Sequence, residues 1–393
     1  MINPHFSCKF FQHFDSMGEI DLNDDITISI TQPELMLDPS VTYSQVLPMF
    51  HQHLDRPKVP FIQKEVEYKA TYQNLNYVDL DKVPAIIPTK DSIELLKFTL
   101  ANLSEHSVLD HILPVLVDDR STNTEEIKEL ADHYNALYIR VDYTSPTFNF
   151  SVINNAAAAL CHAIGFENII LWNSDLWVDN KETVPYLIQQ HQENKVNDVY
   201  ATGVKLLYPT KGFCELMDED KFITSLAKDF GTTEDQILSY NPFGSVQFGG
   251  SAYVTLPFFK QLTPIINSPV HFGRFTKREL PTVNIDRQVQ FMTGAFILCD
   301  LEKYKEVGAL NPSMNSQFQD VDFCHRLNQS SYKIMWYGKD THMLHAESMS
   351  LSSKDSSGGG MKSTHGFQVD MLSNQVLYAS LWNECTLLGT LGV

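Results

Sequence analysis

Apolar runs separated by amphipathic segments, all between residues 83 and 172, constrain the fold of this chain most strongly. The runs are VPAIIP (83–88), ILPVLV (112–117), LYIRV (137–141) and IILW (169–172). Between them apolar residues recur at helical spacing, as in the set Ile93, Leu96, Leu100 and Leu103. Strands that alternate with helices over roughly 100 residues require right-handed crossovers and a parallel sheet. We therefore predict an α/β chain whose mostly parallel, Rossmann-like central sheet is flanked by helices.

The remaining elements are less sharply marked. Asp91 followed by Glu94 predicts the N-cap of the first helix, and Gly165 predicts the C-cap of the third. We expect strands within 199–209, 291–300 and 332–338, a short helix within 211–243, and helices at 301–308, from 319 and over 369–384. The glycines of 243–256 indicate a tight turn or a close backbone approach. Residues 257–287 are expected to be irregular. The Ser/Gly-rich residues 350–366 predict a loop.

Three candidate segments lie at the carboxyl ends of predicted parallel strands. They are Pro88-Thr89, Asp118 and the tripeptide Asn173-Ser174-Asp175. The carboxyl ends of parallel strands lie together, and ligands of open α/β sheets bind at that edge. A carboxylate there can hold a divalent cation against a phosphate. The alternative is a short turn in which Asn173 and Asp175 satisfy backbone donors.

Charge and composition exclude several classes of function. The net charge of −19 repels nucleic acid and anionic lipid. A nucleotide ligand therefore needs positive charge at its binding site, most simply from a metal ion. The six cysteines are scattered without CxxC spacing, which argues against zinc sites and a disulfide framework. No apolar run of about 18 residues and no secretory signal is present. These features predict a cytoplasmic protein.

A series of short motifs occurs in a characteristic order along the chain. They are IIPTKD, VDDRST, FNFSVINNAA, LWNSDLWV, GVKLLYP with VQFGGS, MTGAFIL, VGALN, QDVDFCHRL and HAESMS. From about residue 83 to 385 the chain resembles a family-2 type glycosyltransferase with the GT-A fold. The likeness is to bacterial O-antigen and polysaccharide enzymes of the rhamnosyltransferase-like kind.

The resemblance implies a division of the chain. Residues 81–393 form the GT-A domain, with a nucleotide-sugar half at about 81–180 and an acceptor half at about 181–350. The C-terminal loop and helix occupy 351–393. Residues 1–80 lie outside the resemblance as an N-terminal extension of unknown role. A lead-in domain, a partner-binding arm and a piece of a larger assembly all remain open for it.

The resemblance also implies a metal site that holds Mg²⁺ or Mn²⁺. Asp175 would be a ligand, and His345 resembles the C-terminal histidine that reaches the metal or the diphosphate. Asn173 stands where the family's DxD motif has its first carboxylate, and Ser174 lies between the two positions. A lone histidine after a strand is otherwise an ordinary satisfied polar residue.

Asp320 matches the position of the family's catalytic base, although an Asp at a helix start is more often a cap. Gln319 replaces the glutamate of the family's Glu-Asp pair. Asp322 lies two residues further along the helix and is expected to serve structure.

Donor-binding positions follow from the same resemblance. Asp118, with Asp119 as the alternative, would contact the nucleotide base or ribose; the other interpretation of either residue is a cap of the next helix. Pro88 and Thr89 would line the base pocket through their backbone. Asn154 lies where the family borders the donor site, although Asn154 and the adjacent Asn155 also suit a role in helix packing.

Further candidates lie in the second half of the chain. Gln247 and Gly249-Gly250 would face the acceptor. Glu347, Ser348 and Ser350 extend the histidine motif, and the loop at 351–366 would close over the donor, unless it is simply disordered.

The sequence thus predicts an inverting, metal-dependent glycosyltransferase of cell-surface polysaccharide synthesis. The donor would be a UDP-, dTDP- or GDP-linked sugar, and the acceptor a glycan or lipid-linked glycan at the inner face of the membrane. The main alternative is a catalytically inactive nucleotide-sugar-binding protein or a scaffold of a glycan-assembly complex. A nicotinamide-dependent Rossmann enzyme is disfavoured because no GxGxxG follows the first strand.

Overall fold

The computed structural model of this chain describes residues 8–38, 61–145, 148–257 and 264–347. Five residues of a C-terminal helix are described as well: Asn374, Leu377, Tyr378, Leu381 and Trp382. The predictions for Ser348, Ser350 and the 351–366 loop concern residues outside this described part.

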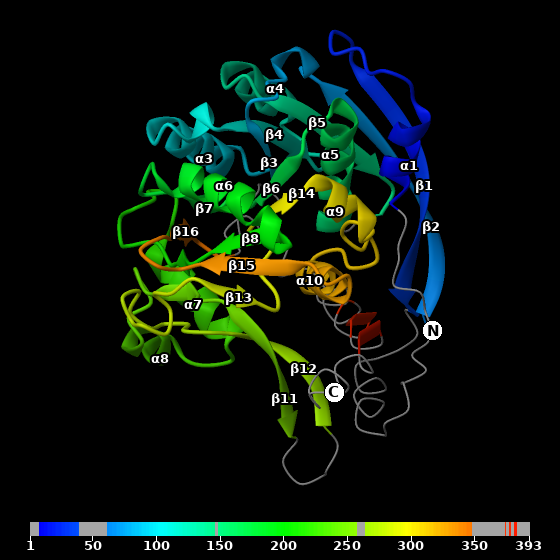
Figure 1. Cartoon of the computed structure of the whole chain (residues 1–393). Helices are drawn as coiled ribbons and strands as arrows, with labels where there is room; N and C mark the ends of the chain where they lie inside the picture. Colours follow the sequence, from blue (N-terminus) through cyan, green and yellow to red (C-terminus); the bar gives the residue numbers. More distant parts are fainter. Residues whose placement is uncertain are drawn as a thin grey trace.

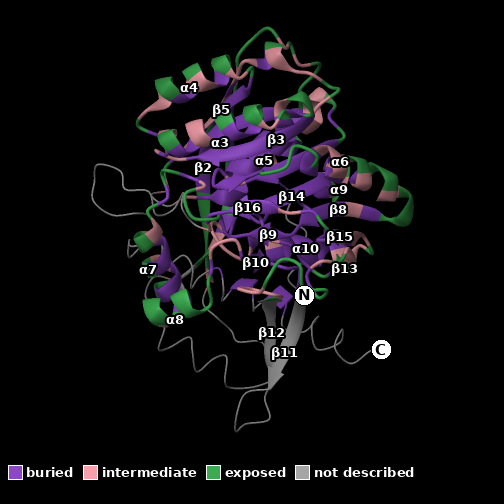
Figure 2. Cartoon of the chain, turned by 90° about the vertical axis from the view of Figure 1, so that its left-hand side faces the viewer, coloured by how far each residue is buried: buried purple, intermediate pink, exposed green. Residues whose placement is uncertain are grey.

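A ten-stranded mixed sheet forms the centre of the molecule (Figure 1). Its order is β1 (Ile26–Leu37), β2 (Phe61–Gln73), β5 (Leu137–Tyr143), β4 (Ile112–Asp118), β3 (Val83–Thr89), β6 (Asn168–Trp172), β14 (Phe296–Asp300), β8 (Val199–Val204), β15 (Lys333–Tyr337) and β13 (Arg287–Val289). The pairs β5–β4, β4–β3 and β3–β6 are parallel, and β14 runs antiparallel to both of its neighbours. β3, β4 and β6 are buried along their whole length, as continuous apolar runs require. Figure 2 shows the buried central strands, β3 among them.

Helices cover this sheet on both faces. The crossover helices α3 (Ile93–Glu105) and α4 (Thr124–His133) contact each other, whereas α5 (Phe150–Ile164) contacts α1 (Lys9–Ser16) and α9 (Leu301–Glu306). Right-handed crossovers place these two groups on opposite faces. The helices α6 (Thr183–Asn194), α7 (Glu219–Asp229), α8 (Glu234–Ser239) and α10 (Gln319–Gln329) belong to the second half of the chain. The predicted α/β fold with its helix-flanked, mostly parallel central sheet is confirmed.

A second sheet has four strands, and one of them directly follows a strand of the large sheet in sequence. Its order is β10 (Val246–Phe248), β9 (Leu206–Leu207), β16 (Met343–His345) and β7 (Leu176–Trp177). The turn Asn173–Asp175 joins β6 of the large sheet to β7 of the small one. A separate hairpin pairs β11 (Ser251–Pro257) with β12 (Pro264–His271). The predicted ligand edge therefore lies at the junction between two sheets.

Residues before 80 join the same core. β2 pairs with β5 from Tyr68 to Gln73, and β1 pairs with β2 along its whole length. The buried rings of Phe10, Phe11 and Phe14 place α1 in the main apolar core. The proposed family boundary at residue 80 stays a prediction, but the described parts of this extension are structurally integrated.

Several local predictions were wrong. Asp91 does not cap α3: it adopts a left-handed backbone with φ 49°, Ser92 is the N-cap, and the Asp91 carboxylate accepts hydrogen bonds from Thr122. The segment 257–287 is not wholly irregular, because it contains β12. The predicted strand 199–209 divides into β8 and β9, and the one predicted within 291–300 begins at Phe296.

Two further predictions agree with the structure. Gly165 ends α5 in the left-handed region, with φ 107°. The C-terminal helix is helical at each residue described within 374–382. Within the described ranges, no helix combines the length and apolar character needed to cross a membrane.

Removing the Phe10 ring tests whether the N-terminal extension belongs to the core. Phe10 is fully buried and its ring centroid lies 6.5 Å from that of Tyr68 in β2. We expect Phe10→Ala to lower the free energy of unfolding by about 3–5 kcal/mol, measured by urea denaturation. Leu80→Ala, at a side chain that is 61% exposed, is the control and should change stability by less than about 0.5 kcal/mol. Equal stability of the two variants would show that the extension packs independently.

Candidate functional site

The turn Asn173–Asp175 is fixed by contacts from three directions. The Asn173 N–H donates to the Ala295 carbonyl at 3.0 Å, and the Leu176 N–H donates to the Asn173 carbonyl at 3.1 Å. The Thr99 hydroxyl of α3 donates to the Ser174 carbonyl at 2.5 Å. Ser174 and Asp175 are buried. The backbone of this turn is therefore held rigidly, and Asp175 points its carboxylate into the protein.

His345 faces this carboxylate from the neighbouring strand. β16 pairs antiparallel with β7, which sets His345 opposite Leu176. His345 Nε2 lies 3.3 Å from Asp175 Oδ1 and 3.5 Å from Asn173 Nδ2. His345 Nδ1 lies 2.9 Å from Gln247 Oε1 of β10. The structure thus brings together Asn173, Asp175 and His345. The side chain of Gln247, which was predicted to face the acceptor, contacts His345.

The donor set suits a divalent cation. A carboxylate oxygen and an imidazole nitrogen are common metal ligands, and two ligands of one octahedral ion stand about 3 Å apart. Among the described residues, no cluster of three or more His, Cys, Asp or Glu side chains forms a metal site. Two protein ligands fit a cation that completes its coordination with substrate phosphates and water, as Mg²⁺ commonly does.

Asp320 lies in the first turn of α10, where it accepts two backbone hydrogen bonds. The Gly294 N–H donates to Oδ2 at 2.7 Å and the Val321 N–H donates to Oδ1 at 2.9 Å. Burial raises the pKa of Asp320, and these hydrogen bonds offset part of the rise. Such a carboxylate is oriented, and its affinity for a proton is enhanced.

The loop before β14 connects Asp320 to the turn. Gly294 donates to Asp320, and the next residue, Ala295, accepts the hydrogen bond from Asn173. Two adjacent residues, Gly294 and Ala295, therefore contact Asp320 and the Asn173–Asp175 turn respectively. This short link shows that the two groups border the same region.

α10 itself is held by the C-terminal helix. Trp382 Nε1 donates to Asp322 Oδ1 at 2.8 Å, and the buried Arg326 guanidinium pairs with Asp322 Oδ2 at 2.7 Å. The His325 ring stacks on Trp382 at 4.6 Å between centroids, and its Nε2 lies 2.6 Å from the Tyr378 hydroxyl. Asp322 thus has the structural role that the sequence predicts.

The start of α5 anchors the segment that leads into α10. The Phe150 N–H donates to the Asn315 carbonyl at 2.6 Å, Asn149 Nδ2 donates to the Pro312 carbonyl at 2.9 Å, and the Ser151 hydroxyl donates to the Met314 carbonyl at 2.6 Å. The Asn155 side chain donates to the Leu310 carbonyl at 2.8 Å and accepts from the Leu310 N–H at 3.0 Å. These contacts give the FNFS motif a positioning role, with Asn155 in helix packing.

Asn154 and Thr89 retain buried polar atoms that make no hydrogen bond within the described structure. Asn154 Nδ2 donates to the Phe150 carbonyl at 2.7 Å, while its Oδ1 has no such contact. Thr89 Oγ1 is also without one, although the Thr89 carbonyl accepts from the Asp119 N–H at 2.9 Å. Pro88 is buried beside Thr89 in β3. The Thr89 hydroxyl, at the end of β3, is suited to a polar ligand at that edge of the sheet.

Asp118 and Asp119 have different surroundings. Asp118 pairs with Thr89 across β4 and β3, as predicted for one shared edge. Its carboxylate accepts from the Ser121 N–H at 2.7 Å, Tyr138 at 2.8 Å and Arg140 at 2.8 Å, and thereby caps the turn before α4.

The Asp119 carboxylate instead faces cations. Arg120 Nε donates to it at 2.9 Å and Lys90 Nζ lies 3.9 Å away, with these two side chains 18% and 25% exposed. Burial raises the pKa of Asp119, against the opposing effect of Arg120 and Lys90. The Arg120 guanidinium also stacks on Tyr143 at 3.6 Å. Partly exposed cations at a strand end can attract a nucleotide.

Glu347 forms a clamp behind His345. Its carboxylate accepts from the Tyr208 hydroxyl at 2.7 Å and pairs with Arg274 at 3.0 Å. Burial favours a higher pKa for Glu347, but Arg274 and Tyr208 together hold its pKa below the ordinary value of 4.5. Glu347 also has a left-handed backbone, with φ 43°. This clamp fixes the chain just beyond the histidine.

Sequence reasoning missed Lys90, Arg120 and Arg274. Lys90 and Arg120 stand inside the motifs IIPTKD and VDDRST, so their position after two predicted strands was a usable signal. Arg274 lies in a segment without periodicity, and its pairing with Glu347 spans 73 positions of sequence. No local sequence pattern predicts the contact between Arg274 and Glu347.

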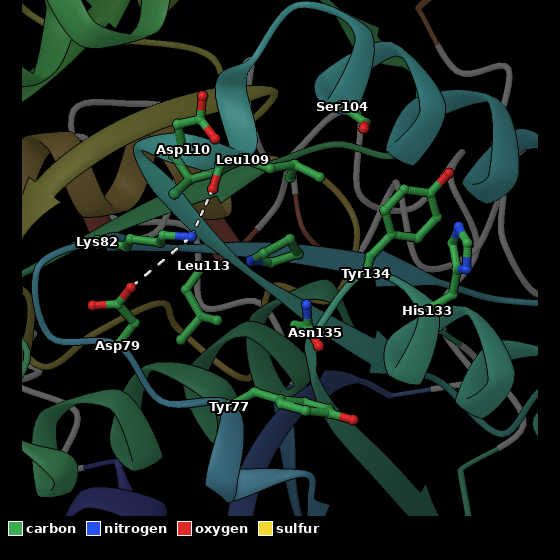
Figure 3. A pocket seen from close by; sticks show the side chains of 12 residues that line it. Tyr77, Asp79, Lys82, Ser104, Leu109, Asp110, Leu113, His133, Tyr134 and Asn135 are labelled. Carbon is green, nitrogen blue, oxygen red and sulfur yellow. Dashed lines mark hydrogen bonds and ion pairs between the residues drawn. The ribbon is translucent and has the colours of Figure 1, made fainter.

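A cavity of about 540 Å³ lies at the opposite edge of the sheet (Figure 3). Its lining includes Ile112 and Leu113, at the amino end of β4, together with Tyr77 and Tyr134. The Lys82 ammonium donates to the Leu109 carbonyl at 2.9 Å and lies 3.9 Å from Asp79. None of the predicted site residues lines this cavity.

Comparison with curated proteins finds distant similarity. The chain is 24% identical over 269 residues to the O-antigen biosynthesis protein RfbC of Myxococcus xanthus, covering 68% of this chain and 18% of that protein. It is 22% identical over 275 residues to the uncharacterized protein y4gI of Sinorhizobium fredii (strain NBRC 101917 / NGR234), covering 70% of this chain and 25% of that protein. The chain thus spans a quarter or less of these relatives. The similarity to RfbC confirms the predicted resemblance to bacterial O-antigen and polysaccharide proteins.

No protein-family model matches the chain. Among solved structures, it is similar to GalNAc-T7 in a crystal structure with UDP, GalNAc and Mn²⁺, at 13% identity and a TM-score of 0.41. That alignment covers 68% of this chain and 44% of the other. The TM-score is low, and the fold assignment rests on the strand order of the chain itself.

Replacing Glu347 by Gln tests the clamp through its pH dependence. Because the folded-state pKa of Glu347 is lowered, its ionic contribution to stability is present above the unfolded pKa and disappears as pH falls through the folded pKa. We expect Glu347→Gln to lower the free energy of unfolding by about 1.5–3 kcal/mol at pH 7, and by progressively less below about pH 4.5.

The measurement is urea denaturation of both proteins across this pH range. Glu105→Gln, at an exposed position at the end of α3, is the matched control. A stability difference that stays constant with pH would contradict an ionic clamp.

Proposed function

We propose that this chain is a glycosyltransferase of bacterial surface polysaccharide synthesis. It transfers a sugar from a nucleotide-sugar donor to a hydroxyl group of a glycan. The convergence of Asp175, His345 and Asn173 beside the loop that holds Asp320 carries this proposal. The similarity to an O-antigen biosynthesis protein supports the biological setting.

Asp175 and His345 are the proposed ligands of Mg²⁺ or Mn²⁺. When bound, the cation would neutralise charge on the diphosphate leaving group. Asn173 adds an amide beside the histidine nitrogen, in place of a second carboxylate. The rigid turn of Ser174 keeps this donor set in place.

The proposed donor is a UDP-, dTDP- or GDP-linked sugar bound along the carboxyl ends of β3, β4 and β6. Pro88, Thr89 and Asn154 would border the nucleotide with their buried polar groups. Asp118, with Asp119 as the alternative, would contact the base or ribose; the Asp118 carboxylate is held by the turn before α4 and the Asp119 carboxylate by Arg120. Lys90 and Arg120 supply positive charge beside Asp119.

Asp320 is the proposed general base. It accepts the proton of the acceptor hydroxyl while that oxygen attacks the anomeric carbon on the face opposite the diphosphate. Two backbone donors orient the carboxylate and leave lone pairs for the incoming proton. One base and no enzymic nucleophile give inversion at the anomeric carbon. A free or lipid-linked glycan acceptor would lie against the half of the chain from about 181 to 350.

Asp320→Asn tests the proposal directly, because it removes the base and keeps the shape. We expect turnover to fall by about 10²- to 10⁴-fold. The measurement is release of nucleoside diphosphate from a panel of UDP-, dTDP- and GDP-sugars, with glycan acceptors present. Nucleotide-dependent thermal stabilisation should be retained, since the side chain does not contact the donor diphosphate in this scheme.

Asp24→Asn is the matched control, at an exposed position outside both sheets. It should retain full turnover. If Asp320→Asn also retained full turnover, Asp320 would not be the base. If the native chain bound donors and turned none over, the catalytically inactive nucleotide-sugar-binding alternative would replace the enzyme.

A further inference from the structure

Gln247 makes a contact that the proposed chemistry does not use directly. It lies in the middle of β10 and is 4% exposed, and its Oε1 is 2.9 Å from His345 Nδ1. β9 lies between β10 and β16 in the small sheet, so the Gln247 side chain extends past β9 to contact His345. A buried glutamine that spans this distance to one ring nitrogen fixes the orientation of the ring.

The chemistry of the contact also selects a tautomer. A glutamine carbonyl oxygen only accepts hydrogen bonds, so His345 Nδ1 carries the proton. In the neutral imidazole the lone pair then belongs to Nε2, the atom that lies 3.3 Å from Asp175 Oδ1. An Nε2 lone pair directed at Asp175 Oδ1 would offer a cation two ligands.

The backbone places Gln247 by close packing. A Cβ on Gly249 would lie 2.6 Å from the Phe272 carbonyl oxygen, so only glycine permits this approach. The Gly249 N–H donates to the same carbonyl at 2.9 Å, and its own carbonyl accepts from Arg287. The VQFGGS motif therefore fixes β10, and with it the side chain of Gln247.

We propose that Gln247 is a positioning residue for the metal site, which holds His345 in the Nδ1-protonated tautomer with Nε2 directed at the cation. This inference rests on the proposed metal role of Asp175 and His345. Outer partners of metal-bound histidines commonly change metal affinity by about 10- to 100-fold when they are removed. Gln247 therefore acts through His345 and does not touch the substrate.

The test compares Gln247→Met, which keeps size and removes the acceptor, with Gln247→Glu, which keeps an acceptor. Mn²⁺ affinity is measured by electron paramagnetic resonance of the free ion, with UDP, dTDP or GDP present. We expect Gln247→Met to weaken Mn²⁺ binding by about 10- to 100-fold and Gln247→Glu to retain it. Gln32→Met, at an equally buried glutamine of β1 that is 2% exposed, should bind Mn²⁺ as the native chain does.

A second readout does not depend on metal. Nitrogen chemical shifts of His345 in the metal-free protein report which ring nitrogen carries the proton. We expect the Nδ1-protonated form in the native chain and in Gln247→Glu, and its loss in Gln247→Met. The same tautomer in the native chain and Gln247→Met would overturn the inference, as would unchanged Mn²⁺ affinity in Gln247→Met. If the native chain binds no Mn²⁺, the metal proposal fails, and the tautomer still decides the role of Gln247.

Discussion

The approach of His345 to Asp175 is the contact on which the candidate site depends. It exists because β16 pairs with β7 in a register that sets His345 beside the turn after β6. The contact of His345 with Asn173 in this turn spans 172 positions of sequence. The small sheet therefore serves to bring a distant histidine to the carboxyl edge of the large sheet, where α/β folds bind their ligands.

The supports of this contact are distributed over the whole chain. Glu347 and Arg274 fix the strand end beyond the histidine, and Gln247 orients its ring. Asp320 depends on a different set, since the C-terminal helix packs on α10 through Tyr378 and Trp382. Even β1 takes part, because its Leu35 N–H donates to Ser313 at 2.8 Å, in the segment that leads into α10. The site is assembled by long-range packing around a short rigid turn.

The sequence predicts the parts of this structure that are encoded locally. The strands β3 to β6 and the helices between them follow from apolar periodicity, and Asp118 and the Asn173–Asp175 turn follow from their position after strands. The cap at Asp91 was mispredicted because its backbone turns left-handed and its carboxylate serves Thr122 instead. The contacts of Arg274 with Glu347 and of Gln247 with His345 could not be predicted, because each joins segments that are 73 or more positions apart in sequence.

Thermal stabilisation by nucleotides tests the central claim most directly. The measurement compares the native chain and Asp175→Asn across UDP, dTDP, GDP and their sugars, with and without Mn²⁺ or Mg²⁺, because ligands of the folded state raise its melting temperature. The account predicts that one nucleotide class stabilises the native chain only when metal is present, and that Asp175→Asn loses this effect while remaining folded. Stabilisation that is independent of metal, or that persists in Asp175→Asn, would contradict a cation held between Asp175 and His345.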